Sequence, residues 1–332
     1  VLDVLIRDGR IAEIAPAIHV PEAEVLEAGG LVCAPGLVDM HVHLRDPGQT
    51  YKEDIHTGCS AAAAGGVTSL ACMPNTTPVC DNPAVIGDIV ERAASAPARV
   101  YPVAAVTASL GGERLTDFAA LKAAGAVAVS DDGRPVPTAG RMLEAMEKAA
   151  ALSLPVLSHC EDLSLTRGGI MNEGTVSAAL GVPGIHRAAE DTATAREIAL
   201  AAAAGLPVHI CHVSTRGSVA LLRDARRRGV PVTGETAPHY FLLTDELLRG
   251  RDADYRMNPP LRTEDDRRAV IEGLKDGTLT AIATDHAPHS PEDKADFLHA
   301  PNGSIGMETS LAAGITALVV PGCLSLSRLI WL

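Results

Sequence analysis

Aromatic side chains are scarce in this sequence, because phenylalanine, tryptophan and tyrosine together make up only 2% of its 332 residues. Hydrophobic residues still reach 47%, so the core must be filled by alanine, valine, leucine and isoleucine. Small and branched side chains of this kind line barrel interiors and the contacts between helices and a sheet. The composition therefore favours an α/β fold over a β-sandwich.

Basic residues are also few, with 28 lysines and arginines against 41 acidic residues and a formal net charge of −13. Nucleic acids and anionic membranes are bound by clustered lysine and arginine, so we expect a small-molecule ligand instead. The sequence contains no run of 18 apolar residues and no basic, apolar leader, which argues against a membrane span and a signal peptide. Seven cysteines without regular spacing favour a reducing compartment, and we predict a cytoplasmic protein.

Residues 1–35 are predicted to form a small β-module that precedes the main domain, residues 36–332. Apolar and charged residues alternate on both sides of Asp8-Gly9, a pair that is a strong hairpin signal. The sequence starts without methionine and stops inside an apolar, helix-like run. We therefore expect pieces to be missing at both ends, including a C-terminal part of the β-module.

From Leu37 onward, short runs rich in valine, leucine and isoleucine alternate with alanine-rich segments of helical periodicity. The predicted strands are 37–44, 67–73, 99–106, 126–131, 155–160, 207–213, 231–236 and 280–285, and the helices between them include 83–96, 138–152, 190–204 and 216–228. Eight such units predict a (β/α)8 barrel of the TIM type. A doubly wound open sheet is the alternative, although no GxGxxG motif follows a strand.

Imidazoles and carboxylates fall at the C-terminal ends of the predicted strands, where a TIM-type barrel has its active site. They are His41 and His43 on strand one, Asp131 and Asp132 on strand four, His159 on strand five, His212 on strand six and Asp285 on strand eight. Each alone has an ordinary explanation, such as a core histidine, a turn or a helix cap. Their convergence on one rim has no such ordinary explanation.

These residue types predict a zinc site. Side chains two positions apart on a strand share a face, so His41 and His43 can bind one metal together. Imidazole and carboxylate are ligands that suit Zn²⁺. Because the set exceeds one tetrahedron, we expect one or two Zn²⁺ ions, with a pair sharing a carboxylate and a hydroxide that serves as nucleophile. Asp285 would accept the proton of that hydroxide and pass it to a leaving nitrogen.

This arrangement resembles the amidohydrolase superfamily. The runs PGLVDMHVHLRDPG (35–48), MPNT (73–76), NPPLR (258–262) and GMET (306–309) resemble bacterial class I dihydroorotases, and the likeness covers nearly the whole chain. The resemblance implies one metal held by His41, His43 and Asp285, and a second held by His159 and His212.

The resemblance also implies that an acid of the fourth strand bridges the two metals. Asp132 matches the family's interval to the histidine of strand five, while Asp131 stays open as an alternative. In hydantoinases and allantoinases this position resembles a carboxylated lysine. Residues 126–133 contain no lysine, which argues against those relatives.

Dihydroorotate carries a carboxylate and a cyclic ureide, so its pocket needs a guanidinium, amides and backbone donors. Arg45 is the expected carboxylate anchor, because its planar fork binds a carboxylate bidentately. The family pattern adds Asn75 and His289 to the carboxylate, and assigns the ring to Asn258 and the backbone from Pro301 to Gly303. A surface salt bridge for Arg45, and turn positions for the two asparagines, are the alternatives.

Other residues are given smaller roles. Segment 286–303 is long and polar for a βα connection, and we expect a mobile active-site loop. His239 stays open between a structural and a functional role, and Glu308 is expected to be a buried supporting residue. Cys72, Cys160 and Cys211 are predicted to serve packing.

The predicted activity is interconversion of N-carbamoyl-L-aspartate and L-dihydroorotate in pyrimidine biosynthesis by a zinc-dependent cyclic amidohydrolase. Two alternatives stay open. One is a hydantoinase-like or allantoinase-like enzyme. The other is an inactive scaffold for aspartate carbamoyltransferase, whose signature, the loss of metal ligands, is not found here. A homodimer, and association of an active enzyme with aspartate carbamoyltransferase, also stay open.

Overall fold

A computed structural model describes residues 1–332, and the chain divides into two compact units, Val1–Pro35 and Gly36–Leu332. In the first unit, β1 (Asp3–Arg7) pairs antiparallel with β2 (Arg10–Ala15). Asp8 and Gly9 connect them with φ of 51° and 70°, and a two-residue turn with positive φ at both positions matches the twist of a hairpin. Most side chains of this unit are exposed to solvent.

The second unit contains eight parallel strands in two sheets, with hydrogen-bonded orders β3-β4-β5-β6 and β12-β11-β10-β7. Parallel bridges Val129↔Val156 and Val42↔His286 join the edges of the two sheets and close the ring. The predicted barrel is confirmed. The alternative prediction, a doubly wound open sheet, is wrong because neither of the two sheets keeps a free edge. The strands are β3 (Leu37–Val42), β4 (Val67–Cys72), β5 (Arg99–Ala105), β6 (Ala128–Ser130), β7 (Leu157–Ser158), β10 (Val208–Ile210), β11 (Val232–Thr236) and β12 (Ala281–Ile282).

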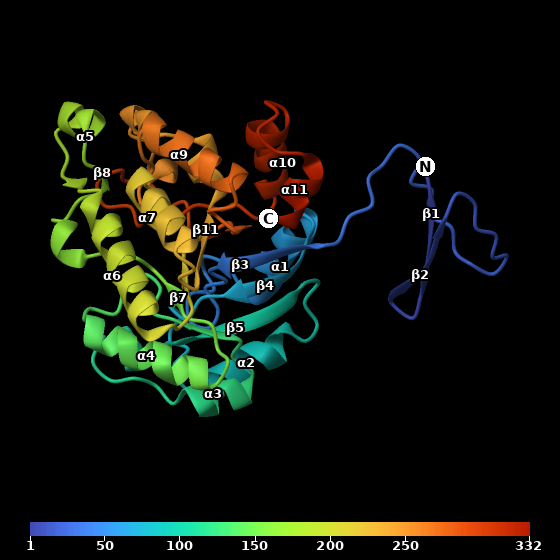
Figure 1. Cartoon of the computed structure of the whole chain (residues 1–332), viewed down its shortest axis with the longest axis horizontal. Helices are drawn as coiled ribbons and strands as arrows, with labels where there is room; N and C mark the ends of the chain where they lie inside the picture. Colours follow the sequence, from blue (N-terminus) through green and yellow to red (C-terminus); the bar gives the residue numbers. More distant parts are fainter. The chain divides into compact units, whose positions relative to one another are not determined.

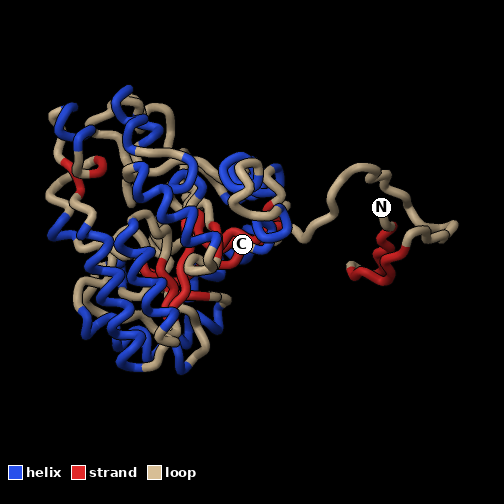
Figure 2. The backbone as a smooth tube through the Cα atoms, turned by 45° about the horizontal axis from the view of Figure 1, so that its top comes forward, coloured by secondary structure: helices blue, strands red, loops and turns tan.

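Helices surround these strands (Figures 1 and 2). They are α1 (Ile55–Ala64), α2 (Pro83–Ala93), α3 (Phe118–Ala124), α4 (Ala139–Ala151), α6 (Ala188–Ala204), α7 (Arg216–Arg227) and α9 (Glu264–Lys275), followed by α10 (Ser310–Gly314), a π-helical turn (Ile315–Val319) and α11 (Leu326–Trp331). The four helices predicted by range are confirmed.

The start of α2 follows from capping signals in the sequence. Asn82 accepts hydrogen bonds from the amides of Ala84 and Val85, and Pro83 occupies the first turn of α2. No helix of the structure is both long and apolar enough to cross a membrane.

The apolar core has two layers of unequal size. The larger lies between strands and helices and includes Cys72 and Cys160. The smaller, inside the barrel, contains only Met73, Val103, Ala128, Leu157 and Cys211. The remaining interior positions near the C-terminal strand ends are polar, which leaves room there for a charged site.

An insertion between β7 and α6 carries β8 (Met171–Asn172), α5 (Thr175–Leu180) and β9 (Gly184–Ile185). Beyond β11 follow α8 (Pro238–Leu242) and two 3-10 turns (Asp245–Gly250 and Ala253–Tyr255). Arg262 ties these segments together, because its guanidinium donates to Ser214 Oγ at 3.1 Å, Asn172 Oδ1 at 3.1 Å and Glu190 Oε2 at 3.4 Å. Arg262 and Glu190 form an ion pair, and both of their side chains are almost fully buried.

Replacement of Arg262 by leucine should strongly destabilise the protein, because Glu190 would remain buried without its cationic partner. We expect a loss of about 3–5 kcal/mol in unfolding free energy, measured by urea denaturation. Arg268→Leu is the control, since Arg268 is 70% exposed and pairs with Glu264 on the surface. It should cost less than about 1 kcal/mol, and equal losses in the two variants would contradict the assignment.

Candidate metal centre and active site

The structure brings the strand-end imidazoles and acids together at one rim of the barrel. His41 lies in β3 and His43 directly after it, and the others follow their strands within three residues: Asp132 after β6, His159 after β7, His212 after β10 and Asp285 after β12. All are buried except Asp285, whose side chain is 12% exposed. Positive φ angles of 35° at His212 and 49° at Asp285, rare for residues with a side chain, turn these two into the site.

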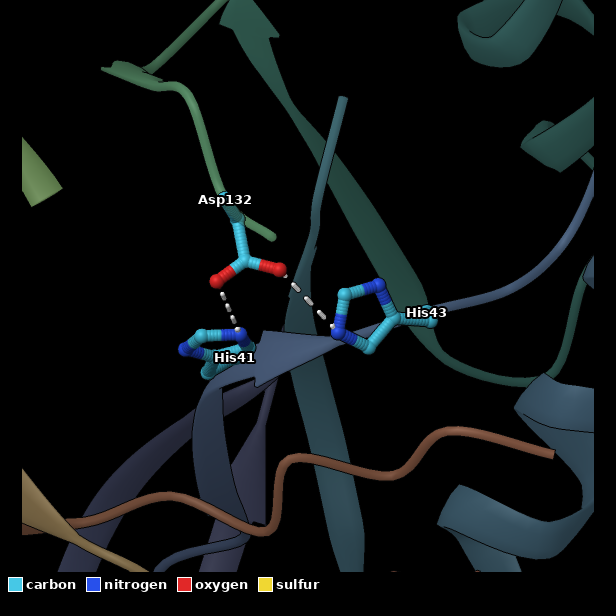
Figure 3. A group of neighbouring side chains, drawn as sticks. All are labelled: His41, His43 and Asp132. Carbon is cyan, nitrogen blue, oxygen red and sulfur yellow. Dashed lines mark ion pairs between the residues drawn. The ribbon is translucent and has the colours of Figure 1, made fainter. Parts of the chain in front are cut away.

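Asp132 lies at the centre of the cluster. Its Oδ1 atom is 3.4 Å from His41 Nε2, 3.4 Å from His159 Nδ1 and 3.5 Å from His212 Nε2. Its Oδ2 atom is 3.4 Å from His43 Nε2. Figure 3 shows the carboxylate between the rings of His41 and His43, with one oxygen directed to each. One carboxylate therefore connects imidazoles from three different strands.

The neighbouring acid has a different environment. Asp131 accepts hydrogen bonds from the amide of Thr107 at 3.0 Å and from the Thr107 hydroxyl, and it contacts none of the four imidazoles. Burial raises its pKa to about 6 against these hydrogen bonds. The structure thus directs Asp132 into the cluster and Asp131 toward the loop that follows β5.

Asp285 completes the cluster from the last strand. Its Oδ1 atom is 3.1 Å from His43 Nε2 and 3.6 Å from His41 Nε2. Burial alone would raise its pKa, but the hydrogen bond with His43 and the charges of the nearby imidazoles lower it to about 2. The imidazoles therefore hold Asp285 in its carboxylate form.

The electrostatics of the cluster favour added positive charge. Burial would raise the pKa of Asp132, but His41, His159 and His212 hold it well below its ordinary value. Burial would lower the pKa of His41, but Asp132 raises it well above the ordinary value. A buried carboxylate of this kind attracts either protons on the imidazoles or a cation between them.

The donor atoms fit a divalent metal. His41 Nε2 and Asp132 Oδ1 are buried without a hydrogen-bond partner, although both belong to polar side chains. Ligands of one tetrahedral zinc ion lie about 3.3–3.6 Å apart, which matches the separations around Asp132. Two groups of potential ligand atoms share that residue, namely His41, His43 and Asp132, and Asp132, His159 and His212.

In three of the four histidines, the ring nitrogen that faces away from Asp132 contacts a further side chain. His41 Nδ1 is 3.1 Å from Glu235 Oε1, His43 Nδ1 is 2.9 Å from Asn75 Oδ1, and His159 Nε2 is 3.4 Å from Glu161 Oε2. Such partners fix the tautomer and ring orientation of a metal-bound histidine. Sequence reasoning missed Glu161 and Glu235, although Glu161 lies two residues after His159, the spacing at which side chains of a strand share a face.

Cys211 is also close to His41 and Glu235, with potential ligand atoms of the three within 4.8 Å of one another. Burial raises the pKa of its thiol to about 12. Cys211 belongs to the apolar cluster inside the barrel, which is the interior packing that the sequence predicted.

A cavity of about 220 Å³ opens beside the cluster. Its lining includes the predicted substrate residues Arg45, Asn75, Asn258, His289 and Gly303. Pro301 is not part of the lining. Its carbonyl instead accepts a hydrogen bond from Lys294 Nζ at 3.0 Å, while Asn302 and Gly303 of the predicted segment 301–303 line the cavity.

Arg45 enters the cavity from the segment after β3. Its Nε donates to the Pro288 carbonyl at 3.1 Å, and its Nη2 lies 3.3 Å from His289 Nε2. Burial, and next the charge of Arg45, lower the pKa of His289 to about 4, so this imidazole is neutral. Arg45 is only 9% exposed and has no carboxylate hydrogen-bonded to it, which argues against a surface salt bridge.

Segment 286–303 contains no helix or regular strand, and it contributes His289, Asn302 and Gly303 to the cavity. Lys294 Nζ anchors it by donating to the carbonyls of Ala253 and Pro301, each at 3.0 Å. Its mobility stays a prediction.

Two further predicted residues have different outcomes. His239 is the second residue of α8, and its Nε2 atom is buried without a hydrogen-bond partner. Its role stays open. The prediction that Glu308 is buried is wrong. Its side chain is exposed just before α10, and Met307 is the buried residue of that motif.

The tandem acids provide a direct test of the metal centre. Asp132→Asn should lose most of its divalent metal on dialysis, because the amide removes the charge that four imidazoles share. Asp131→Asn is the matched control and should keep the metal content of the unsubstituted protein, measured by inductively coupled plasma mass spectrometry. The opposite pattern would show that the wrong acid has been assigned.

Comparisons with known proteins agree with this geometry. A family model described as dihydro-orotase-like matches residues 30–218. A dihydroorotase from Geobacter metallireducens is 53% identical over 99% of this chain and 78% of its own length, and one from Acetivibrio thermocellus is 51% identical with the same coverage.

Among solved structures, an L-hydantoinase (dihydropyrimidinase) from Arthrobacter aurescens superposes with a TM-score of 0.89 at 25% identity, covering 100% of this chain and 76% of that one. A dihydropyrimidinase from Brevibacillus agri covers the same shares with a TM-score of 0.85 at 26% identity. The matched model and these relatives place the chain in the dihydroorotase-like family.

Proposed function

We propose that this chain is a dihydroorotase that interconverts N-carbamoyl-L-aspartate and L-dihydroorotate. The observation that carries the proposal is the position of Arg45, which lines the same small cavity as the imidazole and carboxylate cluster. A cyclic amide with one free carboxylate matches both features at once. The relatives at 51–53% identity carry the same name.

The cluster would hold one or two Zn²⁺ ions through His41, His43, Asp132, His159, His212 and Asp285. All of these are imidazole or carboxylate donors, the set that suits zinc. A bound ion would supply Lewis acidity to the amide carbonyl and lower the pKa of a water molecule.

The protein's own groups would orient the substrate and move the proton. Arg45 would bind the substrate carboxylate through its free guanidinium edge, and Asn258 would offer its unpartnered Oδ1 atom to a ring N–H. Asn75 has its amide oxygen on His43, so its NH₂ group is the part that would donate to the substrate. Asp285, ionised and partly exposed to the cavity, would accept the proton of the attacking water and return it to the ring nitrogen.

A hydantoinase activity is the second candidate, because hydantoinases superpose closely on this chain. Hydantoin lacks a carboxylate for Arg45, and residues 126–133 offer no lysine at the position of Asp132. A substrate panel distinguishes the two. Faster turnover of hydantoin than of dihydroorotate would favour the second candidate.

The zinc-loaded protein should hydrolyse dihydroorotate, followed by the loss of its ureide absorbance. Asp285→Asn should lower kcat by about 10²–10⁴-fold, because the amide cannot accept the proton. Metal content should remain largely unchanged, because Asp132 and the four imidazoles, which form both groups of potential ligand atoms around Asp132, are still present. A zinc-loaded protein without turnover, or an Asp285→Asn variant with full kcat, would refute the proposal.

Arg45→Met should raise the KM for dihydroorotate by roughly 10–100-fold, since hydrogen bonds to a charged group contribute about 1.5–3 kcal/mol. Any turnover of uncharged hydantoin should be much less affected. Arg249→Met is the control, because Arg249 pairs with Glu246 on the surface and should leave KM unchanged. An unaltered KM in Arg45→Met would remove this residue from substrate binding.

A further inference from the structure

Directly beneath the metal centre, a line of polar side chains runs from His41 through the barrel interior to Thr233, which is exposed, and none of these side chains lines the cavity. Glu235 on β11 is only 1% exposed, and its Oε1 atom is 3.1 Å from His41 Nδ1. Its Oε2 atom is 3.2 Å from His209 Nε2 on β10, an ion-pair distance, and both of these atoms are buried without a hydrogen-bond partner. His209 Nδ1 lies 2.8 Å from Thr233 Oγ1.

The placement of protons along this line is restricted. An ionised carboxylate only accepts hydrogen bonds, so the contact of His41 Nδ1 with Glu235 requires a hydrogen on Nδ1. With that hydrogen held there, a bound cation would take the place of a second proton on Nε2, the atom that lies 3.4 Å from Asp132 Oδ1. His209 Nε2 faces the other oxygen of the same carboxylate. One carboxylate therefore faces a ring nitrogen of each of two histidines.

Stabilisation of the fold alone does not account well for Glu235 and His209 in the barrel interior. A buried carboxylate and two imidazoles cost solvation free energy, and apolar side chains of similar size often stabilise a protein as well or better. The only partners of Glu235 are these two imidazoles, one of which belongs to the metal cluster.

We propose that Glu235 and His209 are positioning residues that hold His41 in the metal-binding tautomer. The cation bound by His41 and His43 would then depend on them, whereas the cation bound by His159 and His212 would not. That second group has its own carboxylate, because Glu161 contacts His159 Nε2. The inference rests on the proposed two-ion centre.

The test is zinc titration of Glu235→Leu against a competing chelator, with metal stoichiometry measured in parallel. One of the two ions should bind about 10–100-fold more weakly, and the other should be unchanged. Glu235→Gln keeps an oxygen that can accept from His41, so it should recover part of the affinity. His209→Phe should weaken the same ion by a smaller factor.

Glu197→Leu is the matched control, since Glu197 is an equally buried glutamate that contacts Ser158 and Arg196 rather than an imidazole. It should bind both ions with unchanged affinity. Cobalt substitution adds a spectroscopic measurement, because only the Glu235 and His209 variants should alter the visible absorption of the bound Co²⁺.

Unchanged affinity for both ions in Glu235→Leu would overturn the inference, and so would equal weakening of both. If Glu235→Leu does not fold, Glu235→Gln and His209→Phe decide by the same criterion. Failure of the unsubstituted protein to bind any zinc would instead refute the metal centre and the proposed function.

Discussion

A single carboxylate, Asp132, is enclosed by four imidazoles at the barrel rim and is only 4% exposed. Removing an ionised carboxylate from water costs several kcal/mol even in a protein that can relax around it. Hydrogen bonds from neutral imidazoles offset only part of that cost, because each ring has one N–H and several of these are directed elsewhere. Positive charge at the centre is what makes the arrangement stable, and the surrounding structure determines where that charge can lie.

Closure of the barrel provides the geometry for this centre. His43 and Asp285 are 242 positions apart in the sequence, yet their side chains are 3.1 Å apart because β3 and β12 are neighbours in the ring. The junction is fixed by buried polar contacts. The His43 amide donates to the His286 carbonyl at 2.7 Å, and Asp39 accepts from the Thr284 amide at 3.0 Å. An open sheet with the same strands would separate the first and last ligands, so fold and site depend on one closure.

The strand ranges and the strand-end residues were predictable because both follow from periodicity and parallel topology. Parallel strands present their C-terminal ends at one rim, so residues at those ends meet without any knowledge of loops. Backbone geometry was not predictable in the same way. Arg45, His212 and Asp285 have φ of 59°, 35° and 49°, and no sequence pattern of ordinary residues signals a left-handed conformation at these positions. Loop contacts do not follow from sequence patterns either, and within the predicted segment 301–303 the cavity is lined by Asn302 and Gly303 but not by Pro301.

The carboxylates that sequence reasoning missed complete the charge balance of the site. Asp132, Asp285, Glu161 and Glu235 surround the imidazoles with four negative charges when ionised. Bound divalent cations would offset this charge, which otherwise opposes an anionic substrate. Arg45 lines the cavity as a positive charge beside them, and it suits a ring with one carboxylate. N-carbamoyl-L-aspartate has two carboxylates, so in the direction of ring closure the second would lie toward the imidazole and carboxylate cluster, where a bound metal would supply Lewis acidity for its conversion into the ring carbonyl.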